Sequence, residues 1–168
     1  TQRGKVHFDH LGRLIENLPC DWRDEKPFAI YQPMVQGFED PLVKKYPLLM
    51  LTPHSRYRAH SCFSDHPWLK GDAYRHAVWL SYADAEARGI KDGDLVRVFN
   101  DVGEMVIPAY VTSRIMPGVV AIHHGTWFEL DAKGVDRGGC PNVLLSDEKS
   151  PPAPAHVTGL VQVEKYRK

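Results

Sequence analysis

The sequence has few cysteines, and none of them stands in a metal-binding pattern. Its 168 residues include three cysteines, Cys20, Cys62 and Cys140, and no Cys-X-X-Cys pair. An odd number of widely separated cysteines encodes neither a disulfide framework nor a zinc or iron–sulfur site. Of the nine histidines, only His123 and His124 are adjacent. Adjacent strand residues point to opposite faces, so we expect no metal site from this pair.

Long apolar runs and an excess of charge are absent as well. No apolar run approaches the ~20 residues that a membrane-spanning helix needs. Lysine plus arginine and aspartate plus glutamate each number 21, so the formal net charge is zero. Because general nucleic-acid binders carry a basic excess, the balanced charge argues against that class. With 43% hydrophobic and 25% charged residues, the composition is that of an ordinary globular domain.

The chain divides into an N-terminal segment and a domain of short strands. It has no signal peptide and begins without a methionine, so we expect it to be a piece of a longer or processed polypeptide. Residues 1–46 contain prolines with short runs between them, which is typical of an extended segment lying across a larger body. We therefore expect residues 1–46 to be a lead-in from the preceding domain of a larger subunit. Residues 47–168 are expected to form the folded domain.

Short apolar or alternating runs predict six strands in this domain. They are Leu48–Thr52, Ala77–Leu80, Leu95–Phe99, Glu104–Thr112, Val119–Ile122 and Leu160–Glu164. Ser81 is expected to cap a short helix that ends at Gly89. Pro108, inside one of the strands, indicates a sheet edge or a bulge. The pattern predicts a mainly β fold, a closed barrel with one or two short helices and long loops.

Four polar clusters stand at the ends of these strands. They are TPHSRYRAHS at 52–61, HHGTW at 123–127, GGCPN at 138–142 and HVT at 156–158. Guanidinium groups bind phosphate oxygens in pairs of hydrogen bonds, and hydroxyl and imidazole groups bond the polar edges of heterocycles. The first cluster therefore suits a large phosphorylated cofactor, although a solvated loop has the same composition. Four such clusters at strand ends favour a binding site.

Longer motifs resemble the C-terminal domain of the molybdopterin oxidoreductases. The motifs are L-T-x-H-x-x-x-R-x-H-S at 51–61, D-A-x-x-R-G-I-x-D-G-D-x-V-R-V-F-N-D-x-G-E at 84–104, M-P-G-V-V-A at 116–121, G-G-C-P-N-V-L at 138–144 and L-V-Q-V-E-K at 160–165. The resemblance is strongest to the catalytic subunits of anaerobic dimethyl sulfoxide reductases and covers about residues 40–166.

This resemblance implies a six-stranded double-psi β-barrel that closes over a molybdenum bis(molybdopterin guanine dinucleotide) cofactor. The metal ligand and an iron–sulfur cluster would lie in the missing upstream part, so no catalytic residue and no metal ligand is expected in this chain. In the parent enzyme, the cofactor would reduce S-oxides or N-oxides by oxygen-atom transfer.

The resemblance also implies a set of cofactor-binding residues. They are Thr52, Pro53, His54, Ser55, Arg56, Tyr57, Arg58, His60, Ser61, His124, Trp127, Asn142 and His156. Arg58 is expected to make a charge-assisted contact with the pyrophosphate, and Arg56 could face the same way. His54 and His60 are expected to tune the redox potential of the metal through hydrogen bonds.

Two other functions remain open from the sequence. The chain could come from a nitrate, formate, arsenate or polysulfide enzyme of the same superfamily, or it could be a freestanding double-psi barrel that binds no metal cofactor. For the parent enzyme, the expected partners are the preceding domains of the same subunit, an iron–sulfur electron-transfer subunit and a membrane anchor subunit. No nucleic acid and no direct membrane insertion are expected, and the location implied is the periplasmic or cell-envelope face. The substrate and the choice between molybdenum and tungsten stay open.

Overall fold

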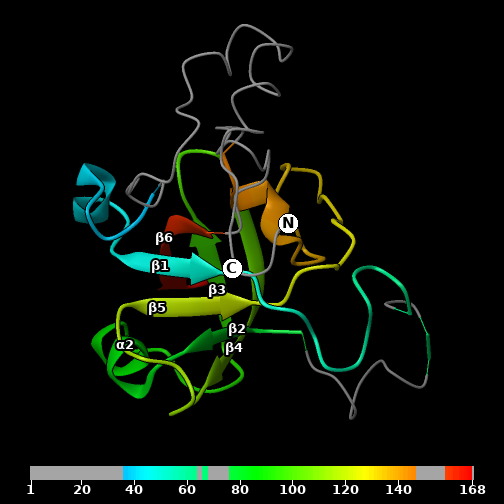
Figure 1. The fold of residues 1–168 in the computed structure, drawn as a ribbon, viewed down its shortest axis with the longest axis horizontal. Helices are drawn as coiled ribbons and strands as arrows, with labels where there is room; N and C mark the ends of the chain where they lie inside the picture. Colours follow the sequence, from blue (N-terminus) through cyan, green and yellow to red (C-terminus); the bar gives the residue numbers. More distant parts are fainter. Residues whose placement is uncertain (1–35, 64–65, 68–75, 147–157, 168) are drawn as a thin grey trace, which may run out of the picture. The chain divides into compact units, whose positions relative to one another are not determined.

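The part of the chain that the structure describes contains a closed six-stranded β-barrel (Figure 1). The computed structural model describes residues 36–63, 66–67, 76–146 and 158–167, all within the unit made of Met34–Asp147 and His156–Lys168. The strands are β1 (Leu48–Leu51), β2 (Val78–Leu80), β3 (Leu95–Phe99), β4 (Glu104–Val111), β5 (Val119–Ile122) and β6 (Thr158–Lys165). Each strand lies within two residues of its predicted bounds.

The order and direction of the strands confirm the double-psi topology. The strands hydrogen-bond in the closed order β1-β5-β2-β4-β3-β6. β1 runs parallel to β5 and β2 runs parallel to β4, whereas the other neighbouring pairs are antiparallel. Exchanging β1 with β4, β2 with β5 and β3 with β6 leaves this order and these directions unchanged. The barrel therefore consists of two interlocked halves with the same connectivity.

Aliphatic side chains fill the barrel, as the strand periodicity predicts. Alternate residues of β3 and β4 are fully or almost fully buried: Val96, Val98, Met105, Ile107 and Ala109. All four residues of β5 are buried, as expected for an apolar run that is covered on both faces. A second buried group, Tyr46, Leu49, Val119 and Leu160, packs together separately from this core. Burying each large aliphatic side chain contributes roughly 1.5–3 kcal/mol.

Pro108 does not mark a sheet edge, contrary to the expectation from sequence. β4 has a neighbour on each side, and its register with β3 is unbroken through the pair Pro108–Leu95. Pairing with β2 begins one residue later, at Ala109. Ala109 N donates toward β3, to Asp94 O at 2.8 Å, so the nitrogen of Pro108 faces the opposite side, where β2 is not yet alongside. The missing N–H of proline therefore removes no ladder hydrogen bond.

The helices of the described part are short. α2 (Tyr82–Ala87) begins after Ser81, whose Oγ accepts the N–H of Asp84 at 3.1 Å, and Gly89 follows it with φ +61°, as predicted. Two 3₁₀ turns, η2 (Pro41–Lys44) and η3 (Pro141–Leu144), complete the set. No helix among the described residues has the length and apolar character needed to cross a bilayer.

Residues 36–46, the described part of the expected lead-in, pack against the barrel. Tyr46 is buried, and its hydroxyl donates to Asp101 Oδ1 at 2.7 Å. Gln36 Oε1 accepts the backbone N–H of Leu160 in β6 at 3.3 Å. Residues 1–35 lie outside the described part, so the domain boundary at residue 46 stays a prediction.

Candidate functional site

Three of the four polar clusters meet at one end of the barrel. β1 and β5 are parallel neighbours with Leu51 opposite Ala121, so the clusters at 52–61 and 123–127 leave the barrel at the same end (Figure 1). β2 is antiparallel to β5, so β2 begins at this end of the barrel. The third cluster reaches the same end, because the carbonyl oxygen of Gly139 contacts His76, which lies just before β2. The fourth cluster contains His156, which lies outside the described residues.

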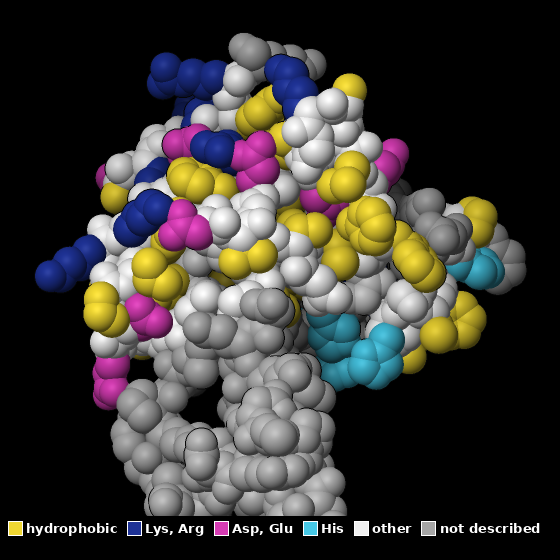
Figure 2. Space-filling model, turned by 90° about the horizontal axis from the view of Figure 1, so that it is seen from above, with side chains coloured by type: hydrophobic (Ala, Val, Ile, Leu, Met, Phe, Trp, Pro, Cys, Tyr) yellow, Lys and Arg dark blue, Asp and Glu magenta, His cyan; other side chains and the backbone are white. Residues whose placement is uncertain are grey.

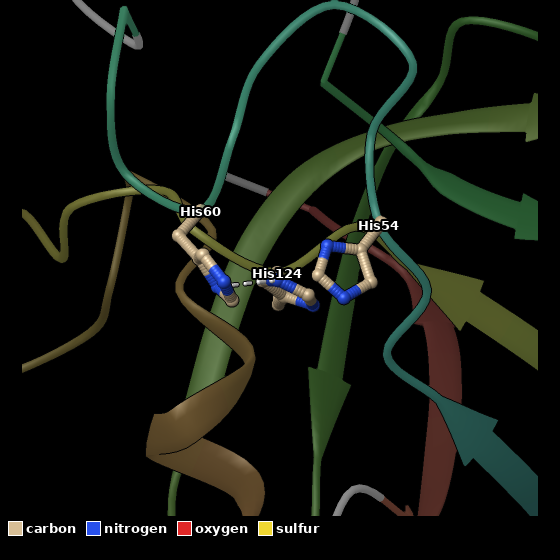
Figure 3. Close-up of side chains that lie close together, drawn as sticks. All are labelled: His54, His60 and His124. Carbon is tan, nitrogen blue, oxygen red and sulfur yellow. Dashed lines mark hydrogen bonds between the residues drawn. The ribbon is translucent and has the colours of Figure 1, made fainter.

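His54, His60 and His124 lie together where the first two clusters meet (Figure 3). One ring nitrogen of each lies within 4.8 Å of the others. His124 Nδ1 is 3.1 Å from the carbonyl oxygen of Thr52, and His124 Nε2 is 3.2 Å from His60 Nδ1. Because a carbonyl oxygen only accepts, His124 Nδ1 carries a proton, and when Nε2 of this ring carries none, it accepts the Nδ1–H of His60. The backbone contact with Thr52 thus orients the ring of His124, and His124 in turn contacts His60.

Close backbone contacts join the same two clusters into one unit. Arg58 Nη2 donates to the carbonyl oxygen of His124 at 2.9 Å, and His124 N donates to Pro53 O at 3.1 Å. Gly125 has φ +87°, and a Cβ there would lie 2.0 Å from the carbonyl oxygen of His60. Only glycine permits this approach. His60 itself adopts a left-handed φ of +50°, an uncommon conformation for a residue other than glycine.

The glycine-rich third cluster is attached to the second by shared hydrogen bonds. The carbonyl oxygen of Gly139 accepts from Thr126 Oγ1 at 2.7 Å and from His76 Nε2 at 2.8 Å. A Cβ at Gly138 would lie 2.1 Å from the carbonyl oxygen of Trp127, and a Cβ at Gly139 would lie 2.5 Å from the His76 ring. The two glycines are therefore required by close packing between the loops.

Asp136 organises this region and was not identified from the sequence. Its side chain is fully buried, and the carboxylate accepts three backbone N–H groups. Asp136 Oδ1 accepts from Glu129 N and Gly138 N, both at 2.8 Å, and Oδ2 accepts from Cys140 N at 2.6 Å. The bond to Gly138, two residues on, is an Asx turn, and this Asp-X-Gly spacing was the available sequence signal.

Two histidines at this end remain neutral near pH 7. Burial lowers the pKa of His76 to about 4, and the charge of Arg58 acts in the same direction. Burial, Arg58 and His124 also lower the pKa of His123. His76 and His123 therefore serve as neutral hydrogen-bonding groups, whereas Arg56 and Arg58 carry positive charge at this end.

We expect His76 to make the chain less stable in acid. Unfolded His76 binds a proton near pH 6.5 and folded His76 only near pH 4, so the unfolded state holds more protons between these values. The free energy of unfolding should fall as the pH drops through this range, by up to about 3 kcal/mol in total. His76→Gln can keep a donor to Gly139 O but does not titrate. Urea unfolding from pH 7 to pH 4 should show a smaller loss for His76→Gln than for the wild type; equal losses would contradict this role.

The predicted cofactor-binding residues differ in exposure. Pro53, His54, Arg56, Tyr57, His60, Ser61, Trp127 and Asn142 are exposed, whereas Thr52, Arg58 and His124 are half-buried. Ser55 is buried, and its Oγ accepts the N–H of Tyr57 at 3.2 Å, so it shapes the loop. Figure 2 shows histidine side chains at the surface next to hydrophobic ones. Aromatic faces, amide and imidazole edges and guanidinium groups are thus available for a planar, charged ligand.

Known proteins resemble this chain over almost all of its length. The family model described as "Molydopterin dinucleotide binding domain" matches residues 48–156. Dimethyl sulfoxide reductase DmsA of Escherichia coli (strain K12) is 49% identical over 98% of this chain and 21% of its own length. The pyrogallol hydroxytransferase large subunit of Pelobacter acidigallici is 37% identical over 99% of this chain and 21% of its own length.

A solved structure has the same fold. Acetylene hydratase from Pelobacter acetylenicus aligns with a TM-score of 0.69 and 20% identity, over 87% of this chain and 22% of that one. The chain spans about a fifth of the length of the curated relatives named above. Since the family model covers well over half of the residues, including the three clusters at the end of the barrel, the chain belongs to the molybdopterin dinucleotide-binding domain family.

Proposed function

We propose that this chain clamps the guanine dinucleotide part of a bis(molybdopterin guanine dinucleotide) cofactor at the end of the barrel where the three clusters meet. The observation that carries the proposal is the joining of the clusters at 52–61, 123–127 and 138–142 into one surface by Arg58, Gly125 and the Gly139 carbonyl oxygen. When bound, the cofactor supplies the oxygen-atom transfer, and the chain supplies binding, orientation and electrostatics.

Each kind of side chain in this surface fits one part of such a cofactor. Arg56 is exposed and its guanidinium suits the pyrophosphate, while the charge of Arg58 adds to the same field. Tyr57 and Trp127, which are 49% and 62% exposed, offer flat faces to the guanine or pterin rings. The amide of Asn142 can both donate to and accept from the edges of those rings. His54 and His60 would bond the pterin and thereby shift the potential of the metal.

The parent enzyme is proposed to reduce S-oxides or N-oxides. The support is the similarity to DmsA and to trimethylamine-N-oxide reductase 1 of Escherichia coli (strain K12), the latter 39% identical over 73% of this chain. Another relative is named a hydroxytransferase, so residues outside this chain would select the reaction, and other enzymes of the superfamily are the second candidate. An upstream iron–sulfur cluster, an electron-transfer subunit, a membrane anchor subunit and a location at the cell envelope belong to the same proposal and rest on the resemblance.

Replacing Trp127 should reduce the cofactor content of the full-length subunit. Stacking of an aromatic side chain on a base contributes roughly 1–3 kcal/mol, so Trp127→Ala should weaken retention of the cofactor about tenfold or more. Molybdenum, and guanine nucleotide released by acid, would be measured per subunit after dialysis.

Tyr82→Ala is the matched control for this experiment. Tyr82 is 63% exposed, close to the 62% of Trp127, but it begins α2, which follows β2. Because β2 is antiparallel to β5, Tyr82 lies at the opposite end of the barrel from the site. Equal cofactor content in Trp127→Ala, Tyr82→Ala and the wild type would contradict a stacking role for Trp127.

A further inference from the structure

We propose that His54, His60 and His124 also form a binding site for a divalent transition-metal ion, which occupies this surface when the dinucleotide does not. This inference rests on the proposed function only in placing both ligands on the same side chains. Two of the three nitrogens already stand at the right separation. Ligand nitrogens 2.0–2.1 Å from a tetrahedral metal lie roughly 3.3 Å from each other, and His124 Nε2 and His60 Nδ1 are 3.2 Å apart.

The orientation of His124 is that of a metal ligand. Its Nδ1–H donates to the carbonyl oxygen of Thr52, and histidines that bind metals usually donate their second N–H to such a group. This contact leaves the lone pair of Nε2 pointing at His60. A metal ion would replace the proton that the two rings share, and this proton would move to the Nε2 of His60, a side chain that is exposed.

His54 can supply the third nitrogen by a side-chain rotation. Its ring centroid lies 4.1 Å from that of His124 and 5.1 Å from that of His60, and its side chain is exposed. The movement needed is small, since the three ligand nitrogens already lie within 4.8 Å of one another. Three imidazoles on an exposed surface leave a fourth position for water, the arrangement of an open tetrahedral site. Imidazole ligands suit Zn²⁺, Ni²⁺ and Cu²⁺, whereas Mg²⁺ and Ca²⁺ prefer oxygen.

The surrounding loops hold two of the ligands in place but also limit the affinity. The contact between Gly125 and the His60 backbone fixes the two loops against each other. Arg58, which donates to the carbonyl oxygen of His124, adds a positive charge that repels a divalent cation. The same positive charge of Arg58 attracts the phosphates of a dinucleotide. We therefore expect the metal ion to exchange readily and to be displaced when a dinucleotide binds.

Titration of the EDTA-treated chain with ZnCl₂ tests the site in the absence of any nucleotide. Calorimetry should give one Zn²⁺ per chain, and Co²⁺ should show the visible absorption of tetrahedral coordination. His54→Gln and His60→Gln should each weaken Zn²⁺ binding at least tenfold, while His66→Gln, outside the cluster, should leave it unchanged. Circular dichroism of each variant checks that the barrel is folded. Equal binding by all the variants would mean an adventitious ion only, and either this result or the absence of binding would overturn the proposal.

A second measurement separates this proposal from the proposed function. Zn²⁺ binding would be compared between full-length subunit that contains the molybdenum cofactor and subunit that has lost it. Binding only in the cofactor-free form supports mutual exclusion, and equal binding in both forms overturns it. If the three-histidine site binds Zn²⁺ but the full-length subunit never contains guanine nucleotide, the metal site stands and the clamp function fails. If the full-length subunit contains guanine nucleotide, and neither the cofactor-free subunit nor the isolated chain binds Zn²⁺, the clamp function stands and the metal site fails.

Discussion

Asp136→Asn should lower the free energy of unfolding of the chain by about 3 kcal/mol or more. An asparagine can keep an oxygen toward Glu129 N and Gly138 N, but its NH₂ group then faces the N–H of Cys140, which now donates to Asp136 Oδ2 at 2.6 Å. Hydrogen bonds to a charged group contribute roughly 1.5–3 kcal/mol each, and leaving a buried donor unsatisfied costs about 1–3 kcal/mol more. For a chain of this length the midpoint of thermal unfolding should fall by about 6–12 °C. Urea unfolding followed by circular dichroism gives the free energy directly.

Asp40→Asn is the matched control for Asp136. Asp40 also accepts a backbone N–H, that of Leu42 at 2.8 Å, but at an exposed site before η2. Asparagine caps such a turn as well as aspartate does, so this variant should change the stability by less than about 0.5 kcal/mol. Similar small losses for Asp136→Asn and Asp40→Asn would show that the carboxylate at 136 does not organise its loop.

The strands and their hairpin could be predicted because their signals are local. The apolar run Val119–Ile122 and the alternation in β3 and β4 appear within a few residues, and the structure follows them. Asn100 makes one set of contacts that local patterns predict and one that they do not. Its Oδ1 accepts Val102 N and Gly103 N at 2.9 and 3.2 Å, which turn chemistry predicts, but its Nδ2 also donates to Leu144 O at 2.7 Å. That second contact joins residues 44 positions apart, which no local pattern indicates.

The loops of the candidate site could be predicted more completely than the contacts that join them. Two of the polar clusters follow buried strands in the sequence, and the parallel pairing of β1 and β5 brings both to the same end of the barrel. The roles of Asp136 and His76 could not be derived in the same way. Asp136 is followed by glycine at 138, a common pairing in surface turns, and only its complete burial distinguishes it. His76 acts through Gly139, 63 residues away, so its role depends on the closed barrel.

Arg58→Ala should remove most of the cofactor from the full-length subunit, because under the proposed function this arginine would act in two ways. Under the proposed function, its charge would contribute to the field that attracts the pyrophosphate, and its Nη2 donates to the carbonyl oxygen of His124 at 2.9 Å. Losing one charge-assisted hydrogen bond costs roughly 1.5–3 kcal/mol, which corresponds to an affinity about 10 to 100 times lower. Arg58→Lys should restore the cofactor only in part, since an ammonium keeps the charge but lacks the planar fork of donors. Molybdenum and guanine nucleotide per subunit are the quantities to measure.

Arg114→Ala controls for the loss of one positive charge. Arg114 is exposed and follows β4, which runs parallel to β2 and therefore ends away from the site. Its removal should leave the cofactor content at the wild-type value. Thermal unfolding of the Arg58→Ala chain must be measured beside the cofactor content, because separation of the two loops would also lower occupancy. If this variant unfolds like the wild type and still retains full molybdenum and guanine nucleotide, Arg58 does not hold the dinucleotide, and the positive charge of the site must come from Arg56.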